Sequence, residues 1–104
     1  MSIKNISVLG TGTMGHGIAL LSAEAGLNVK MYGRTDVSLN RGFNNIKSSL
    51  KLLKNEGNLS EDKCREILGR IKGVNTIEKA AENVQLVIEC VAENLELKQN
   101  IFKQ

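Results

Sequence analysis

Short apolar runs separated by glycines open the chain. Ile3–Leu9 ends in a continuous apolar stretch, which is typical of a strand covered on both faces of a sheet. The alanine- and leucine-rich segment Met14–Ala25 predicts a helix that Gly26 ends, and Asn28–Tyr32 predicts a second strand. Strand, glycine turn, helix and strand make a βαβ unit, which implies a right-handed crossover between parallel strands.

Two amphipathic helices are predicted next. In the first, apolar side chains recur at helical spacing and lysines occupy the other faces. Ser60 is the predicted N-cap of the second helix, where Glu61 and Asp62 lie at the positive end of the helix dipole, and this helix runs to about Gly69. The apolar positions of the first helix are Phe43, Ile46, Leu50 and Leu53.

The remaining pattern completes half of a doubly wound fold. Ile71–Val74 predicts a short strand, Ile77–Ala81 a short helix, and Val84–Val91 a strand that is apolar almost throughout. Leu95–Lys103 predicts the start of another helix. The expected fold class is α/β, a Rossmann-type doubly wound parallel sheet that is incomplete, with strand order 3-2-1-4 and an inserted helical hairpin over about residues 36–69.

Composition and charge narrow the choice of function. The 104 residues make room for one small domain, and the net charge of +3 is spread without a basic block, which favours phosphorylated small molecules over nucleic acid. Cys64 and Cys90 form no CxxC pair and are expected to be reduced thiols. No metal site is predicted. No apolar run approaches the roughly 20 residues of a membrane helix, and no signal peptide precedes the first strand, so a cytoplasmic protein without membrane contact is expected.

The glycines after the first predicted strand form the pattern G-x-G-x-x-G. Gly10 permits a tight turn, Gly12 lets the backbone approach a pyrophosphate, and Gly15 lets the following helix pack close to the sheet. The amino end of that helix then offers free N–H groups to phosphates. The position of the pattern in a βαβ unit favours a dinucleotide site, and the alternative is a glycine-rich turn with a structural role only.

Two stretches together resemble the 3-hydroxyacyl-CoA dehydrogenase family, whose short bacterial forms are 3-hydroxybutyryl-CoA dehydrogenases. They are GTGTMGHGIA and VIECVAENLELKQNIF, and the resemblance covers nearly all 104 residues. It implies reversible hydride transfer between a 3-hydroxyacyl-CoA and a nicotinamide cofactor, giving a 3-ketoacyl-CoA. It also implies that the pyrophosphate turn consists of Gly10, Gly12, Thr13, Met14 and Gly15.

The resemblance implies further contacts outside the turn. Glu93 and Lys98 are expected near the nicotinamide half of the cofactor, and Ser49 and Lys54 on the helical hairpin are expected near the CoA nucleotide. Each has a plainer alternative, since a glutamate can open a helix and a lysine on an exposed helix is commonly solvated.

The catalytic dyad of the family, a histidine supported by a glutamate, has no counterpart in this sequence. His16 is the only histidine, and we expect it to be an ordinary helix residue near the cofactor. The chain is therefore expected to be the N-terminal part of a dinucleotide-binding domain, without catalytic residues, inactive alone, and with an open sheet edge at Val84–Val91. The catalytic remainder and the C-terminal helical domain would be absent, and the full-length enzyme would act on acyl-CoA as a homo-oligomer. A non-catalytic dinucleotide-binding module is the alternative.

The second predicted strand ends on an unusual tripeptide, Gly33-Arg34-Thr35. The resemblance places an aspartate at position 33 in members that use NAD, where it would accept hydrogen bonds from the adenosine ribose and repel a 2′-phosphate. Gly33 removes that carboxylate and opens space, Arg34 supplies a charged fork suited to phosphate, and Thr35 adds a hydroxyl donor. NADP is therefore the preferred cofactor. NAD remains the alternative, with Arg34 solvated and Asp36 reaching the ribose.

Overall fold

The computed structural model describes residues 3–91 and 94–99, which form a five-stranded sheet with four helices. The strand order is β3-β2-β1-β4-β5, and β1 to β4 run parallel as the sequence predicts. The strands are β1 (Asn5–Leu9), β2 (Asn28–Tyr32), β3 (Ile71–Val74), β4 (Leu86–Val91) and β5 (Asn94–Gln99). The helices are α1 (Thr13–Glu24), α2 (Asp36–Asn55), α3 (Glu61–Gly69) and α4 (Ile77–Ala81).

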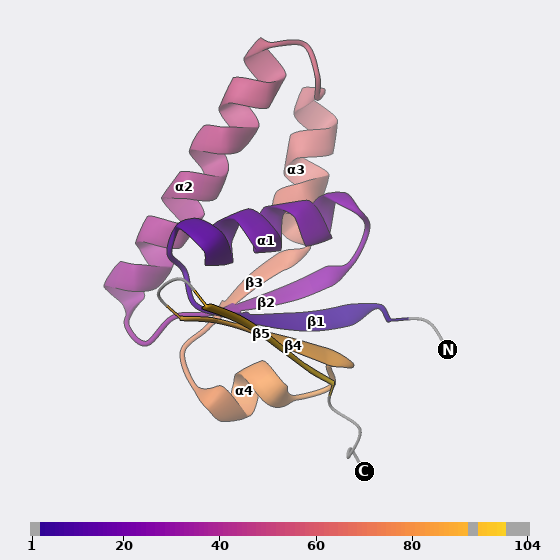
Figure 1. Ribbon diagram of the computed structural model, residues 1–104. Helices are drawn as coiled ribbons and strands as arrows, with labels where there is room; N and C mark the ends of the chain where they lie inside the picture. Colours follow the sequence, from indigo (N-terminus) through magenta and orange to yellow (C-terminus); the bar gives the residue numbers. More distant parts are fainter. Residues whose placement is uncertain (1–2, 92–93, 100–104) are drawn as a thin grey trace.

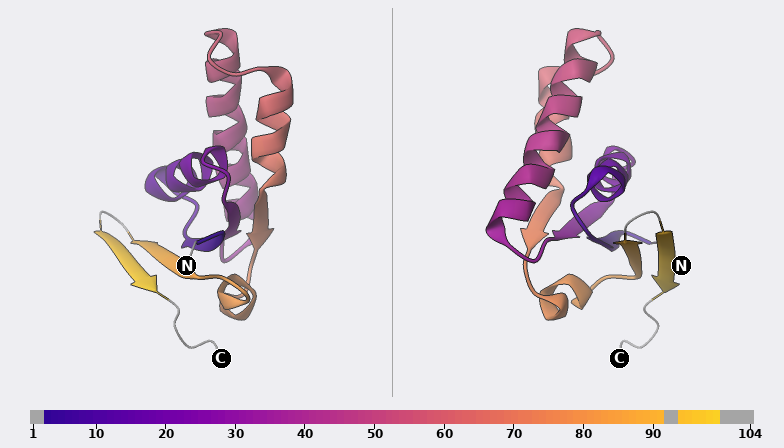
Figure 2. Two further views of the ribbon diagram at one scale, coloured as in Figure 1. Left: turned by 90° about the vertical axis from the view of Figure 1, so that its right-hand side faces the viewer. Right: turned by 60° about the vertical axis from the view of Figure 1, so that its left-hand side comes forward.

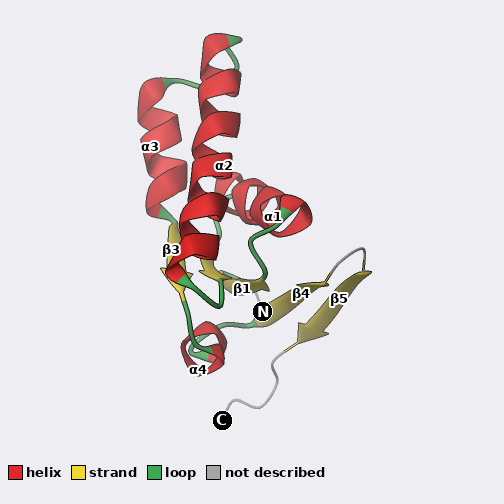
Figure 3. Ribbon diagram, turned by 90° about the vertical axis from the view of Figure 1, so that its left-hand side faces the viewer, coloured by secondary structure: helices red, strands yellow, loops and turns green. Residues whose placement is uncertain are grey.

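Helices cover the two faces of the sheet unequally. α1, α2 and α3 lie on one face, and α4 lies alone on the other (Figures 1 and 3). α2 and α3 form a hairpin that rises away from the sheet, as Figure 1 shows. The predicted N-cap is confirmed, because the Ser60 hydroxyl accepts a hydrogen bond from the Lys63 N–H at 3.1 Å. None of the helices described here is both long and apolar enough to cross a membrane.

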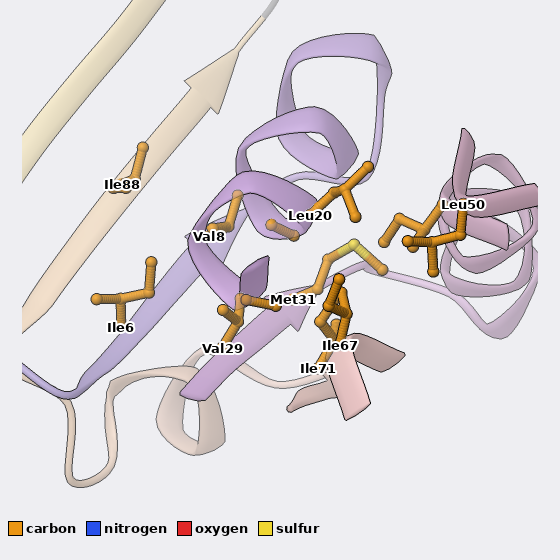
Figure 4. Packing of buried hydrophobic residues seen from close by; sticks show 12 residues of the cluster. Ile6, Val8, Leu20, Val29, Met31, Leu50, Ile67, Ile71 and Ile88 are labelled. Atoms are coloured by element: carbon orange, nitrogen blue, oxygen red, sulfur yellow. The ribbon is translucent and has the colours of Figure 1, made fainter. Parts of the chain in front are cut away.

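The core is aliphatic and lies between the sheet and the first three helices. Alternate residues of β1 and β2 point to that side, among them Ile6, Val8 and Met31, all of them at most 1% exposed. Figure 4 shows these side chains meeting others from α1, α2, α3, β3 and β4. The neighbouring elements contribute Leu20, Leu50, Ile67, Ile71 and Ile88.

The prediction of a helix from Leu95 is wrong. The segment forms β5, antiparallel to β4, with Leu95 opposite Cys90 and Lys98 opposite Val87. In the sequence NLELKQ, leucines alternate with polar residues, which suits a strand. Pairing also satisfies the backbone groups of β4, so β4 is not the open sheet edge that the sequence predicts; Figure 2 shows the two strands side by side.

Two polar side chains attach α4 to the second face of the sheet. The buried Ser7 hydroxyl donates to the carbonyl of Ala80. The ammonium group of Lys30 donates to the carbonyls of Lys79 at 2.9 Å and Glu82 at 2.6 Å, near the carboxyl end of the helix. These bonds fix the position of α4, whose first residue, Ile77, lines a pocket at the carboxyl ends of the strands.

Candidate functional site

Two adjoining pockets lie at the carboxyl ends of β1, β2 and β4. The first, of about 540 Å³, is lined by the end of β2, the start of α2, Ile77 and Glu89. The second, of about 670 Å³, is lined by residues of the glycine turn. Gly10, Thr11 and Cys90 border both, so the two form one groove across the turn. Ligands of open α/β sheets bind at this edge.

The turn itself requires glycine at Gly10 and Gly15. Gly10 has a φ of 130°, and a Cβ there would lie 2.9 Å from the carbonyl oxygen of Cys90. Gly15 is buried, and a Cβ there would overlap the carbonyl oxygen of Gly10. The close approach that the sequence predicts for Gly15 is thus to the turn that precedes its own helix.

Gly12 is different, because nothing in the described chain crowds it. Its φ of −71° and ψ of −164° suit any residue, and a Cβ there would meet no atom within 4 Å. It is exposed and faces the second pocket together with Thr13 and Met14. The surrounding chain leaves room for a larger residue at this position, so the close approach of a ligand to the backbone is a physical reason for glycine in addition to its favourable capping of α1.

The amino end of α1 has no side-chain cap and no negative charge, which suits the binding of an anion. Gly12 is the N-cap residue and provides no side-chain cap, and the first turn of α1 contains no acidic residue. The other three described helices each have a Ser or Thr cap and an acidic residue in the first turn. The free N–H groups of α1 and its positive dipole end are therefore available to a phosphate.

His16 lies in the first turns of α1 and is occupied by local bonding. The ring nitrogen Nδ1 of His16 is 2.7 Å from the carbonyl oxygen of Gly12. The backbone N–H of His16 donates to the same oxygen at 2.9 Å. This arrangement supports the turn and agrees with the expectation that His16 is an ordinary helix residue near the cofactor site.

Gly33 lies at the end of β2 in a crowded position, which corrects the expectation that this glycine opens space. Its N–H donates to the carbonyl of Val74 at 3.0 Å, and its φ is outside the left-handed region. A Cβ at Gly33 would lie 2.8 Å from Ser38 Oγ, 2.9 Å from Leu39 Cγ and 3.1 Å from Thr11 Cγ2. Neighbouring side chains already fill the place that a residue larger than glycine would need.

Arg34 and Thr35 border the first pocket in different ways. Arg34 is exposed and lines the pocket. Thr35 is the N-cap of α2, and its hydroxyl accepts a hydrogen bond from the Ser38 N–H at 3.1 Å and lies 3.3 Å from Ser38 Oγ. The Thr35 hydroxyl therefore caps the amino end of α2. Asp36 lines a separate pocket with Lys30 and Lys72, away from the wall that Arg34 forms.

Several lining residues are absent from the prediction made from the sequence. Tyr32, Ser38, Ile77, Glu89 and Cys90 border the first pocket. Their shared signal is position, since each lies either in the carboxyl-terminal half of a parallel strand or in the first turn of the helix that follows one. Burial raises the pKa of the Cys90 thiol, which keeps the thiol neutral beside the glycine turn. Cys64 is the other free thiol and packs between α2 and α3, where its Sγ is 3.8 Å from the carbonyl oxygen of Leu50.

Four predicted contacts lie apart from the groove or outside the described residues. Lys54 pairs with Glu61 at 2.6 Å and so links α2 to α3; this hydrogen-bonded pair raises the pKa of Lys54 and lowers that of Glu61. Ser49 is half-buried on α2, and neither it nor Lys54 lines the two pockets of the groove. Lys98 lies on β5 opposite Val87, back from the carboxyl end of β4. Glu93 lies outside the described residues.

Comparisons with known proteins show the family of this chain. The family model for the NAD-binding domain of 3-hydroxyacyl-CoA dehydrogenase matches residues 5–104. A probable 3-hydroxybutyryl-CoA dehydrogenase of Bacillus subtilis is 37% identical over 99% of this chain and 36% of its own length. The 3-hydroxyadipyl-CoA dehydrogenase of Escherichia coli is 34% identical over 100% of this chain and 22% of its own length.

Solved structures give the same result. The (S)-3-hydroxybutyryl-CoA dehydrogenase PaaH1 of Ralstonia eutropha superposes with a TM-score of 0.84 at 36% identity, over 89% of this chain and 32% of that chain. FadB2 of M. tuberculosis superposes with a TM-score of 0.86 at 32% identity, over 90% of this chain and 33% of that chain. The chain thus spans about a third or less of the length of these relatives. It belongs to the family of 3-hydroxyacyl-CoA dehydrogenase NAD-binding domains.

Proposed function

We propose that the groove at the carboxyl ends of β1, β2 and β4 holds a nicotinamide dinucleotide, with its pyrophosphate at the amino end of α1. The observation that carries this proposal is the open Gly12 in front of a helix end without a side-chain cap. The adenosine end occupies the first pocket, against Tyr32 and Ile77. The nicotinamide end occupies the second pocket, beyond Gly12 and Met14.

The chain then serves as the cofactor-binding part of an oxidoreductase that interconverts 3-hydroxyacyl-CoA and 3-ketoacyl-CoA, in particular 3-hydroxybutyryl-CoA and acetoacetyl-CoA. The names of the relatives support this substrate class. The bound cofactor would accept the hydride from C3 of the acyl chain or return it there. The residues of this chain bind and orient the cofactor, and the base that takes the 3-hydroxyl proton is proposed to come from outside the groove residues described here.

The cofactor preference is proposed to be NADP(H). Arg34 is exposed in the wall of the first pocket, beside a strand end that has no carboxylate. Among the described residues, the acidic one that lines this pocket is Glu89, which comes from β4, and β1 separates β4 from β2. At the usual strand spacing this places Glu89 roughly 10 Å from the end of β2, too far to take the role of an aspartate at position 33. Asp36 faces the other pocket, which weakens the NAD alternative.

Arg34→Ala is expected to weaken NADPH binding and leave NADH binding nearly unchanged. Removing one charge-assisted bond to a 2′-phosphate costs about 1.5–3 kcal/mol, or roughly ten- to a hundredfold in Kd. Isothermal titration of both reduced cofactors against the wild type and the variant measures this. Arg41→Ala is the matched control, since Arg41 is an exposed arginine of α2 that does not line the groove. Equal loss of both cofactors in Arg34→Ala would leave the dinucleotide site in place and reject the NADP preference.

A further inference from the structure

Ser38 occupies the place where a side chain at position 33 would begin. A Cβ on Gly33 would lie 2.8 Å from Ser38 Oγ. Apart from the residues adjacent to Gly33 in the sequence, no atom of the described chain would be closer to this Cβ. Gly33 is buried, and its φ does not demand glycine. The residue at position 33 is therefore limited by the room that Ser38 leaves, with Leu39 and Thr11 closing the same space.

Hydrogen bonds to Thr35 fix the position of the Ser38 hydroxyl. It donates to the carbonyl oxygen of Thr35 at 2.9 Å and accepts from the Thr35 N–H at 3.3 Å, while the Ser38 N–H donates back to the Thr35 hydroxyl at 3.1 Å. This is a capping box, in which the residue three positions beyond the N-cap is commonly a long Glu or Gln. The short serine side chain keeps its oxygen close to the backbone, next to Gly33. Leu39 Cγ lies almost as close to that position, at 2.9 Å, and its side chain packs against the core.

The same hydroxyl forms part of the wall of the first pocket. Ser38 lines it together with Gly33, Arg34 and Thr35, at the amino end of α2. A hydroxyl has a single proton, so the Ser38 O–H would exchange its bond to the Thr35 carbonyl for a bond to an anion in the pocket, while its oxygen keeps accepting from the Thr35 N–H. Under the proposed function, the anion next to Ser38 in the first pocket would be a phosphate on the adenosine ribose.

We infer that Ser38 is a specificity-determining residue that acts with Gly33 as one unit. Its hydroxyl excludes an aspartate from position 33 and adds a hydrogen-bond donor beside Arg34 for the 2′-phosphate of NADP(H). This inference rests on the proposed function, because it assigns the adenosine end of the cofactor to the first pocket. A switch of preference toward NAD(H) then needs changes at both positions.

A double-mutant cycle tests this coupling with the wild type, Gly33→Asp, Ser38→Ala and the protein that carries both. Gly33→Asp alone is expected to melt well below the wild type and to gain little NADH affinity. Adding Ser38→Ala should restore part of the lost melting temperature, since Leu39 and Thr11 still border the position, and tighten NADH binding about tenfold relative to Gly33→Asp alone. Ser38→Ala alone should weaken NADPH about tenfold and leave NADH unchanged.

Ser60→Ala is the matched control, because it also removes a serine hydroxyl that caps a helix, but on α3 and away from the groove. It should lower the melting temperature without changing either affinity. The inference is overturned if Gly33→Asp melts like the wild type and binds NADH as tightly as the double variant, or if Ser38→Ala changes both cofactors alike or neither. Arg34→Ala distinguishes failure of the proposed NADP preference from failure of this inference. Equal weakening of both cofactors in Arg34→Ala rejects the NADP preference. The melting temperatures of the double-mutant cycle still decide whether positions 33 and 38 compete for space.

Discussion

Replacing Gly12 with valine should leave the protein folded and remove most of its cofactor affinity. The backbone at Gly12 is extended and a Cβ there would meet no atom within 4 Å, so the fold accommodates a branched side chain. That side chain would project into the space in front of α1, where the pyrophosphate is proposed to lie. Losing two charge-assisted bonds at about 1.5 kcal/mol each raises Kd by more than about a hundredfold.

Circular dichroism melting and titration with NADPH check the two halves of this expectation separately. A valine N-cap is less favourable than glycine by about 1 kcal/mol, so a small decrease in melting temperature is expected. Gly12→Ala is the control, since it changes the cap similarly but adds only a methyl group and should weaken binding less. Native affinity in Gly12→Val would show that the pyrophosphate binds elsewhere, and loss of the fold would show that the backbone itself needs glycine.

Gly15→Ala should damage the fold itself. A Cβ at Gly15 would overlap the carbonyl oxygen of Gly10 and lie 2.7 Å from its carbonyl carbon, and both are backbone atoms that cannot turn aside. The turn and α1 must then separate, at a cost of about 3 kcal/mol. The whole stability of a domain of this size is about 5–15 kcal/mol. We therefore expect the melting temperature to fall by about 10 °C or more.

Gly17→Ala, in the same helix, is the matched control for that measurement. A Cβ at Gly17 would meet nothing within 4 Å, and glycine inside a helix is less favourable than alanine. This variant should therefore be more stable than the wild type by about 0.5–1 kcal/mol. If both variants melt like the wild type, the close contact between Gly15 and Gly10 does not limit the fold.

Most of the fold follows from local sequence patterns. The strands Asn28–Tyr32 and Ile71–Val74 and the helix Ile77–Ala81 have the predicted bounds, and β1, α1 and β4 differ from the prediction only at their ends. These elements are predictable because apolar runs between glycines and caps leave few alternatives. β5 is different, since its short alternation of leucines and polar residues suits a strand but the antiparallel pairing with the edge of β4 depends on the tertiary structure.

The site is only partly predictable for a similar reason. The glycine turn has a fixed spacing, and the structure confirms its crowded positions Gly10 and Gly15. The crowding of Gly33 by Ser38 depends on how α2 begins, and the positions of Ile77 and Glu89 depend on strand order. The contacts proposed for Ser49, Lys54, Glu93 and Lys98 stay predictions, as do the cytoplasmic location and the homo-oligomeric state.

Titration of the isotopically labelled protein with NADPH, followed by backbone amide NMR, tests the central claim most directly. Bound cofactor should shift the amide signals of Gly12, Thr13 and Met14 strongly, and that of Arg34 more with NADPH than with NADH. The amides at the far end of the helical hairpin, around Lys54 and Glu61, should remain in place, because that end is remote from the groove (Figure 1). Saturating shifts confined to the turn and the end of β2 would support the account. Unchanged glycine-turn signals at millimolar NADPH and NADH would contradict it.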